Sequence, residues 1–344
     1  MPGLSSDTRP LALTMGDPAG ISAEITVAAW RALRTAKDLS WFISIDDPRR
    51  LKALGVPVIE IEDAREASID DFQQAIPVLA ELLPSTPTAA KPVAEHAQSV
   101  LNSIDRAVAL ALTGQVSAVV TNPINKKALY DGVDFPFGGH TEYLAHIGGA
   151  SRSVMMLVGG GLRVVPTTIH VPLSRVMEEL TPALLQETLE ITHAALRRDF
   201  GVADPRIAVS GLNPHAGEKG SIGREEIEMI TPVLDRMRSQ GMHLLGPSPA
   251  DTLFHEAARE RYDAAVCMFH DQALIPVKTL AFDEGVNATL GLPFIRTSPD
   301  HGVAYDIAGR GVARADSLLA AIRLAGEMAA RRAAFDAARS PQTR

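Results

Sequence analysis

The chain has 344 residues, a length that favours two domains, because a single hydrophobic core stops growing at roughly 250–300 residues. Its 46% hydrophobic and 22% charged residues are typical of a globular protein. The net charge of −8 argues against nucleic acid or an anionic membrane as a partner, since neither polyanion would be attracted. A single cysteine, Cys267, excludes an internal disulfide and fits a reducing cytosol.

The sequence also lacks the signals of export. Residues 1–10 have neither the basic start nor the apolar stretch of a secretion signal. No segment reaches the roughly 18–20 apolar residues that a membrane-spanning helix needs. We therefore expect a cytoplasmic protein with no membrane partner.

Strand and helix patterns alternate along the first third of the chain. Leu11–Thr14 is predicted as a short buried strand, followed by a Gly/Pro turn. Ser22 is the expected N-cap of a helix that ends near Arg34. The same rhythm continues with strands at 41–45, 56–61 and 117–121, a loop at 83–95 and an Ala-rich helix at 95–112.

The rest of the chain repeats this alternation. A hairpin is predicted around Gly159–Gly161, and Pro232 is expected to kink or restart a helix. The other predicted segments are strands at 154–157, 162–168, 206–209 and 262–268, a helix from 181 and a last helix from 315. Strands that alternate with helices at this density predict an α/β sandwich with mostly parallel strands.

Three histidines stand where an apolar strand-like run gives way to a polar turn: His170, His215 and His270. Ligands of α/β proteins collect beyond the carboxyl ends of strands, and neutral imidazole is a good ligand for a divalent metal. A single histidine in such a place is more often a surface or hydrogen-bonded residue. Three in equivalent places favour one shared metal site, which would assemble only in the fold because no HExxH spacing occurs.

Other candidate residues have two interpretations each. His140 and Thr141 follow two glycines, either as an anion-binding helix start or as an ordinary one. Lys278 and Arg296 stand in apolar runs with Asn287, and such cations either form internal salt bridges or bind an anion. The Gly-rich turn at 300–311 either wraps a nucleotide or caps the next helix. GxGxxG and Walker A motifs are both absent.

Seven segments together resemble the 4-hydroxythreonine-4-phosphate dehydrogenase (PdxA) family of vitamin B6 synthesis. Each is weak alone, but together they occur in the family's order, and the resemblance covers about residues 11–330. The segments are Gly16–Gly20, Gly139–Glu142, Gly211–Gly217, Pro249–Phe254, His270–Gln272, Gly291–Ser298 and Asp300–Gly302.

The resemblance implies a two-domain α/β/α sandwich similar to isocitrate and isopropylmalate dehydrogenases rather than a standard Rossmann fold. The expected domains are 1–137 with 280–344, on the nucleotide side, and a central metal, substrate and dimerisation domain at 138–279. The resemblance also implies a homodimer whose active site lies at the interface. It assigns one divalent ion (Zn, Mg or Co) to His170, His215 and His270, substrate to His140, Thr141, Lys278, Asn287 and Arg296, and NAD or NADP to Asp306, Gly309 and Gly311.

The implied activity is NAD(P)-dependent oxidation of 4-phosphooxy-L-threonine to 2-amino-3-oxo-4-phosphooxybutanoate, which loses CO2 to give 3-amino-2-oxopropyl phosphate. Asp251 is the candidate general base, or it orients a metal ligand; as an alternative it caps a helix. Two other functions stay open. One is a dehydrogenase of 4-phospho-D-threonate or 4-phospho-D-erythronate, and the other is a non-catalytic metal- or phosphate-binding protein.

Overall fold

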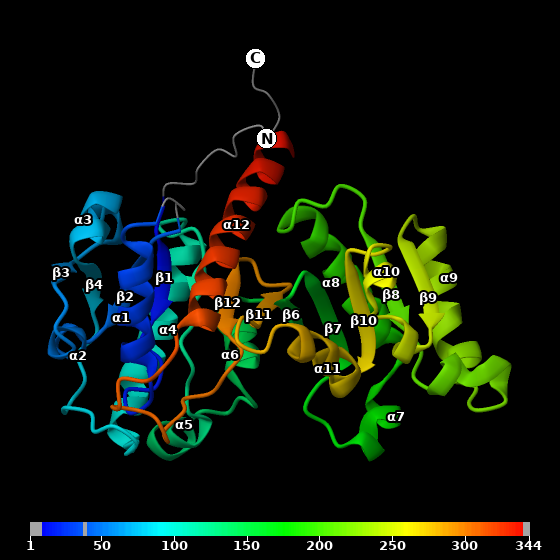
Figure 1. Cartoon of the computed structure of the whole chain (residues 1–344), viewed down its shortest axis with the longest axis horizontal. Coiled ribbons are helices and arrows are strands. Elements are labelled where there is room, and N and C mark those ends of the chain that lie inside the picture. Colours follow the sequence, from blue (N-terminus) through cyan, green and yellow to red (C-terminus); the bar gives the residue numbers. More distant parts are fainter. Residues whose placement is uncertain (1–8, 37–39, 340–344) are drawn as a thin grey trace. The chain divides into compact units, whose positions relative to one another are not determined.

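The computed structural model describes residues 9–36 and 40–339, and the chain divides into two compact units (Figure 1). Unit 1 runs to Ser153 and includes Leu292–Ala334. Unit 2 consists of Val154–Gly291 and the chain from Phe335. The predicted domains change at residues 137 and 280 instead. The segment considered for a secretion signal lies mostly outside the described residues.

Unit 1 is built on parallel strands in the order β3-β4-β2-β1-β5-β12. β1 and β2 are buried along their whole length, as expected for strands that helices cover on both faces. The bounds are β1 Leu11–Thr14, β2 Phe42–Asp46, β3 Val58–Ile61, β4 Ile76–Ala80, β5 Val119–Val120 and β12 Arg296–Pro299. The helices are α1 Ser22–Leu33, α2 Pro48–Ala53, α3 Ile69–Gln74, α4 Ala97–Leu112, α5 Lys126–Gly132, α6 His140–Ile147 and α12 Asp316–Arg339.

The strand order of unit 1 reverses at β1: β2 and β4 lie on one side of it and β5 on the other. The chain passes from β1 to β2 through α1, and from β4 to β5, on the other side of β1, through α4. Because such crossovers are right-handed, α1 and α4 belong on opposite faces of the sheet. Open α/β sheets bind ligands beyond the strand ends at such a reversal. The loops after β1 and β5 are therefore candidates for a binding site.

Unit 2 has strands in the order β11-β6-β7-β10-β8-β9. β11, β6 and β7 are antiparallel neighbours, whereas β7, β10, β8 and β9 run parallel. The strands are β6 Val154–Gly159, β7 Leu162–Thr168, β8 Arg206–Ser210, β9 His243–Ser248, β10 Ala264–Phe269 and β11 Val286–Leu290. The helices are α7 Val176–Glu179, α8 Pro182–Arg198, α9 Thr231–Ser239, α10 Glu256–Arg259 and α11 His270–Leu280.

Most predicted elements are present, and the predicted α/β class with mostly parallel strands is confirmed. β6 and β7 form the expected hairpin, and Pro232 lies in the first turn of α9, where a π-helical turn at Glu226–Ile230 gives way to α-helix. The N-cap prediction was wrong: Ile21 is the cap, and the Ser22 hydroxyl donates to the Asp17 carbonyl oxygen at 2.8 Å. Ser22 therefore fastens the preceding loop to α1.

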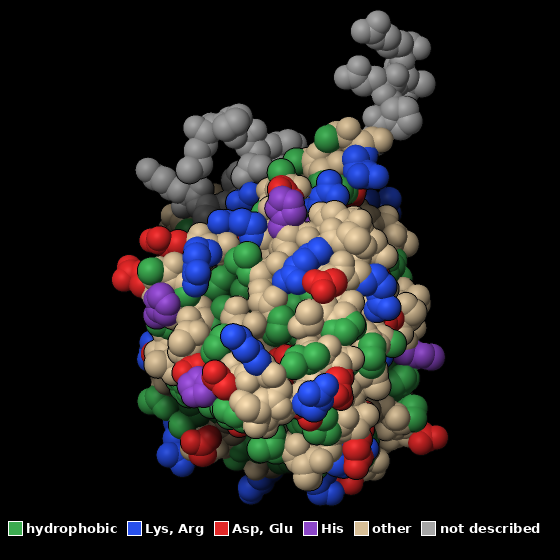
Figure 2. Space-filling view, turned by 90° about the vertical axis from the view of Figure 1, so that its right-hand side faces the viewer, with side chains coloured by type: hydrophobic (Ala, Val, Ile, Leu, Met, Phe, Trp, Pro, Cys, Tyr) green, Lys and Arg blue, Asp and Glu red, His purple; other side chains and the backbone are tan. Residues whose placement is uncertain are grey.

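Two further observations concern the apolar character of the helices and the distribution of charge on one face. None of the helices in the described ranges is long and apolar enough to cross a membrane. On the face shown in Figure 2, Lys and Arg side chains are interspersed with Asp and Glu side chains.

Candidate active-site residues

The three candidate metal ligands follow adjacent parallel strands of unit 2. His170 comes shortly after β7, His270 directly after β10 and His215 after β8, and the sheet order is β7-β10-β8. Side chains tie these strand ends together. The Thr168 hydroxyl donates to the Met268 carbonyl oxygen at 2.8 Å. One strand further, the Gln272 amide donates to the Gly211 carbonyl oxygen at 2.9 Å.

His170 and His270 lie side by side. Their ring centroids are 5.7 Å apart, with 43° between the ring planes. His270 Nδ1 lies 2.7 Å from Asp271 Oδ1. A carboxylate accepts, so Nδ1 donates its proton and the Nε2 lone pair is left for another partner. Metal-binding histidines are typically held by such a carboxylate. Sequence reasoning missed this role of Asp271, although it adjoins His270 in the motif.

His170 and His215 both have left-handed backbone, with φ of 51°. Such φ values are uncommon outside glycine and gather at functional sites, where the surrounding structure enforces them. Within the described ranges, however, no group of three or more His, Cys, Asp or Glu side chains is arranged to hold a metal ion. One chain thus pairs His170 with His270 but does not complete a three-ligand group with His215.

A buried glutamate holds the loop that carries His215. Glu226 is 3% exposed, and its Oε1 accepts from the backbone N–H groups of Leu212 and Asn213, each at 2.8 Å. Its Oε2 accepts from Asn213 Nδ2 at 3.0 Å. Gly217 has a φ of 76°, and a Cβ there would lie 2.5 Å from Glu226 Oε2. No local pattern in the sequence predicts this anchor.

We expect Glu226→Gln to lower the free energy of unfolding by about 1.5–3 kcal/mol, because it weakens the buried hydrogen bonds that the carboxylate accepts. Urea denaturation measures the loss. Glu228→Gln is the matched control, since Glu228 forms an exposed ion pair with Arg224 that contributes at most about 1 kcal/mol. Equal effects of the two substitutions would contradict the anchoring role.

Asp251 and Asp271 border one cavity of about 480 Å³ in unit 2, together with Phe254, Gln272 and Ile275. Asp251 is exposed in a short 3-10 helix, Ala250–Thr252, whose N-cap is Pro249. The alternative role of Asp251 as a helix cap is therefore wrong. The cavity places its carboxylate where it can meet a ligand beside the end of β10.

The two other substrate candidates of unit 2 have different surroundings. Lys278 lies on α11 with its Nζ 5.5 Å from the Phe282 ring centroid, a cation–π contact. It is half-buried rather than enclosed. Asn287 lies in β11, and its Oδ1 is buried without a hydrogen-bond partner. Such a buried acceptor is costly unless a ligand or water satisfies it.

Unit 1 brings together Arg296, His140 and Thr141. Arg296 is 3% exposed at the start of β12, and its Nη2 lies 3.5 Å from His140 Nδ1. Burial lowers the pKa of Arg296 to about 10, so it stays charged at neutral pH. His140 begins α6, with Thr141 next in the same turn, as predicted. Burial, then Arg296 and Lys126, hold the pKa of His140 well below its usual range.

The candidate cofactor loop, at residues 300–311, is hydrogen-bonded to α1 and to the loop after β1, where the strand order of unit 1 reverses. Glu24 accepts from the N–H groups of Gly309 and Gly311 at 3.0 and 2.9 Å. Tyr305 donates to Asp17 Oδ2 at 2.6 Å. Both glycine amides are therefore already satisfied, and the side chain of Asp306 remains exposed for a ligand. A cavity of about 210 Å³ borders Gly309 and Glu24.

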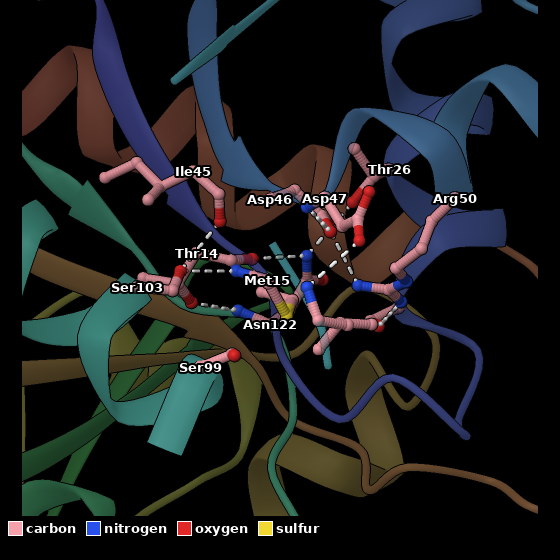
Figure 3. A network of polar contacts seen from close by, with 12 residues as sticks. Thr14, Met15, Thr26, Ile45, Asp46, Asp47, Arg50, Ser99, Ser103 and Asn122 are labelled. Atoms are coloured by element: carbon pink, nitrogen blue, oxygen red, sulfur yellow. Dashed lines mark hydrogen bonds and ion pairs between the residues drawn. The ribbon is translucent and has the colours of Figure 1, made fainter. Parts of the chain in front are cut away.

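A buried polar network connects strand ends of unit 1 (Figure 3). Ser103 accepts from the Met15 N–H at 2.9 Å and donates to the Ile45 carbonyl oxygen at 2.7 Å. The Asn122 amide donates to the Thr14 carbonyl oxygen at 2.9 Å. Burial raises the pKa of Asp46 to about 6 although Arg50, at 2.7 Å, opposes the shift. The network joins the ends of β1, β2 and β5.

Comparison with known proteins places this architecture in a family. The family described as pyridoxal phosphate biosynthetic protein PdxA matches residues 36–325. The chain belongs to the PdxA family. It is 54% identical over 329 residues to the 4-hydroxythreonine-4-phosphate dehydrogenase of Roseobacter denitrificans, covering 95% of this chain and 99% of that protein.

Other PdxA relatives and a solved structure agree. The 4-hydroxythreonine-4-phosphate dehydrogenase of Paracoccus denitrificans is 50% identical over 331 residues, covering 95% of this chain and 100% of that protein. The crystal structure of the Klebsiella pneumoniae 4-hydroxythreonine-4-phosphate dehydrogenase is similar with a TM-score of 0.84 and 38% identity, covering 93% of this chain and 99% of that one. The resemblance drawn from the seven sequence segments is confirmed.

Proposed function

We propose that the chain oxidises 4-phosphooxy-L-threonine at C3 with NAD or NADP, giving 2-amino-3-oxo-4-phosphooxybutanoate, which decarboxylates to 3-amino-2-oxopropyl phosphate. The family description and the names of the relatives support this substrate. The structural observation that carries the proposal is the His170–His270 pair at adjacent strand ends, with Asp271 directing His270 Nε2 toward a ligand.

His170, His215 and His270 would hold one divalent ion, Zn, Mg or Co. These donors fit a divalent metal, because the imidazoles of His170 and His270 lie together and His270 has a fixed tautomer. A set of nitrogen ligands alone favours Zn or Co. When bound, the ion supplies Lewis acidity at the C3 oxygen. Because one chain does not complete a three-ligand group within its described ranges, we assign the site to a homodimer in which each subunit completes the other's ligand set.

The reaction needs a base, and the exposed carboxylate of Asp251 is the candidate. It would accept the C3 hydroxyl proton while the C3 hydride passes with its electron pair to the nicotinamide, so that the alcohol is oxidised and the cofactor reduced. The resulting 3-keto acid would lose CO2 as the electrons of the C1–C2 bond pass to the C3 carbonyl, and the enolate so formed would take up a proton at C2 to give 3-amino-2-oxopropyl phosphate. The cavity that Asp251 borders also contains Asp271, the partner of His270.

Cations of both units are assigned to the substrate's anionic groups by the family resemblance. Arg296, the His140–Thr141 turn and Lys278 offer donors to these groups, whereas the buried Oδ1 of Asn287 offers an acceptor. Asp306 is assigned to the dinucleotide, where a carboxylate accepts from ribose hydroxyls as in other dinucleotide sites. Gly309 and Gly311 shape this loop, because their amides are engaged by Glu24.

The test is the formation of reduced nicotinamide with each candidate substrate. Oxidation of 4-phosphooxy-L-threonine in preference to 4-phospho-D-threonate and 4-phospho-D-erythronate supports the proposal. Oxidation of only the latter two would establish the phospho-sugar-acid alternative. Metal binding without oxidation of any of the three would establish the non-catalytic one.

A shared site predicts complementation between inactive subunits. Mixing inactive His215→Ala with inactive His270→Ala protein should restore up to about a quarter of wild-type activity. The estimate assumes random exchange, in which half of the dimers are hybrids with one intact site each. Mass spectrometry of subunits with different masses confirms that exchange has occurred. Full exchange without recovered activity would place both histidines of a site in the same chain.

A further inference from the structure

Thr121 lies buried at the end of β5, and its hydroxyl holds the guanidinium of Arg296. Thr121 is 0% exposed, and its Oγ1 accepts from Arg296 Nε at 3.1 Å and from Nη2 at 2.6 Å. The sheet fixes this arrangement, because the Thr121 N–H donates to the Thr297 carbonyl oxygen at 3.0 Å in the neighbouring parallel strand. The Thr121 hydroxyl therefore helps to fix the orientation of the Arg296 guanidinium.

The same guanidinium determines which nitrogen of His140 carries a proton. Arg296 Nη2 lies 3.5 Å from His140 Nδ1, and a guanidinium can only donate. Nδ1 is therefore the acceptor, and in the neutral ring the proton is on Nε2. His140 Nε2 is buried and has no hydrogen-bond partner. A buried donor without a partner is destabilising, and an acceptor atom of a ligand would satisfy it.

The charges around His140 keep its ring neutral. Arg296 faces it from β12, and Lys126 reaches it from α5. Lys126 Nζ lies beside Gly139, 3.1 Å from where a Cβ would stand, and Glu142 Oε2 of α6 lies 2.9 Å from the same point. Burial, then Arg296 and Lys126, hold the pKa of His140 well below its usual range. At neutral pH the ring is an uncharged donor beside two cations, a combination that suits an anionic oxygen.

We propose that Thr121 is a positioning residue that acts through Arg296. Its hydroxyl fixes the guanidinium against His140 Nδ1, so that His140 is held as the Nε2–H tautomer and donates to a phosphate or carboxylate oxygen of the substrate. The tautomer follows from the geometry of unit 1 alone. Its consequence for turnover rests on the proposed function, which assigns His140 and Arg296 to substrate binding.

Nitrogen NMR of protein labelled with 15N-histidine tests the tautomer directly, with the His140 signals assigned by their loss in His140→Gln. In the wild type we expect an unprotonated Nδ1 and a protonated Nε2, unchanged from pH 8 to pH 6. Thr121→Val, which replaces the hydroxyl by a methyl group, should give a mixture of tautomers at pH 8. Thr121→Ser keeps the hydroxyl and should retain the wild-type signals. Lys126→Met removes a cation that does not touch Nδ1 and should leave the tautomer unchanged.

Kinetics supply the second readout. Thr121→Val should raise the KM for 4-phosphooxy-L-threonine about tenfold with a much smaller change in kcat, because one substrate hydrogen bond of about 1.4 kcal/mol is lost in ground state and transition state alike. Thr121→Ser should restore most of the affinity. A merely structural role of Thr121 would lower the melting temperature without moving the His140 signals.

Two results would overturn the positioning role. One is a protonated Nδ1 on His140 in the wild type, a measurement that needs no variant to fold. The other is a folded Thr121→Val protein whose His140 tautomer is unchanged. A wild-type protein that shows the expected tautomer but does not oxidise the substrate would refute the proposed function and support the positioning role.

Discussion

Alanine at His170, His215 or His270 is expected to lower kcat/KM for 4-phosphooxy-L-threonine by about 1,000-fold or more and to remove the bound metal. A Lewis acid contributes several kcal/mol to such a reaction, and each 1.4 kcal/mol is a factor of about ten. The fold should survive, because all three side chains lie at strand ends rather than in the core. Metal analysis and steady-state kinetics on the purified variants measure both effects.

His243→Ala is the matched control for these three variants. His243 belongs to the same unit, at the start of the edge strand β9, and faces Asp204 at 3.3 Å on the surface. Its loss should leave metal content and turnover close to wild type. If any one of the three strand-end variants kept full activity after its metal was removed, that histidine would not be a ligand of a catalytic metal.

The second large effect concerns the phosphate. We expect 4-phosphooxy-L-threonine to be oxidised at least about 100-fold more efficiently than free 4-hydroxythreonine, because two charge-assisted contacts contribute about 1.5–3 kcal/mol each. Arg296→Met and Lys278→Met should each erase much of this preference while metal binding is retained. Arg296 should have the larger effect, since its charge is almost fully buried and that of Lys278 is only half-buried.

Kinetics on the two compounds measure the preference. Lys127→Met serves as the control, because Lys127 is an exposed cation of unit 1 that pairs with Asp131 at 2.8 Å. It should not alter the ratio of the two efficiencies. Equal efficiency on the phosphorylated and free compounds in the wild type would refute the phosphate assignment and make both cations structural.

Where the sequence pattern is regular, it predicted the fold. The predicted strand Leu11–Thr14 has the same bounds as β1, and the glycines at 159–161 correctly predicted the hairpin of β6 and β7. Short apolar runs between turn residues are typical of buried strands. Four strands were missed: β4, β9, β11 and β12. β4 contains Pro77, which usually argues against a strand, and β12 reads Arg-Thr-Ser-Pro, whose polar residues are buried only because the sheet and α12 surround them.

The candidate site was predictable in part for a similar reason. Histidines after apolar runs indicated where strand ends would lie, and the structure puts those strands side by side. The residues that hold them were not predictable. Glu226 reaches Leu212 and Asn213 across the turn, and Thr121 reaches Arg296 through sheet pairing far apart in sequence. Such partners depend on tertiary geometry that a local pattern does not encode.

The most direct measurement follows reduced nicotinamide in one wild-type preparation, first as purified, then stripped by a chelator and then reconstituted with Zn, Mg or Co. With NAD or NADP and 4-phosphooxy-L-threonine, we predict oxidation that disappears on stripping, returns with metal and releases one CO2 for each reduced nicotinamide. Unchanged turnover after the metal is gone, or no turnover in any of the three states, would contradict the account.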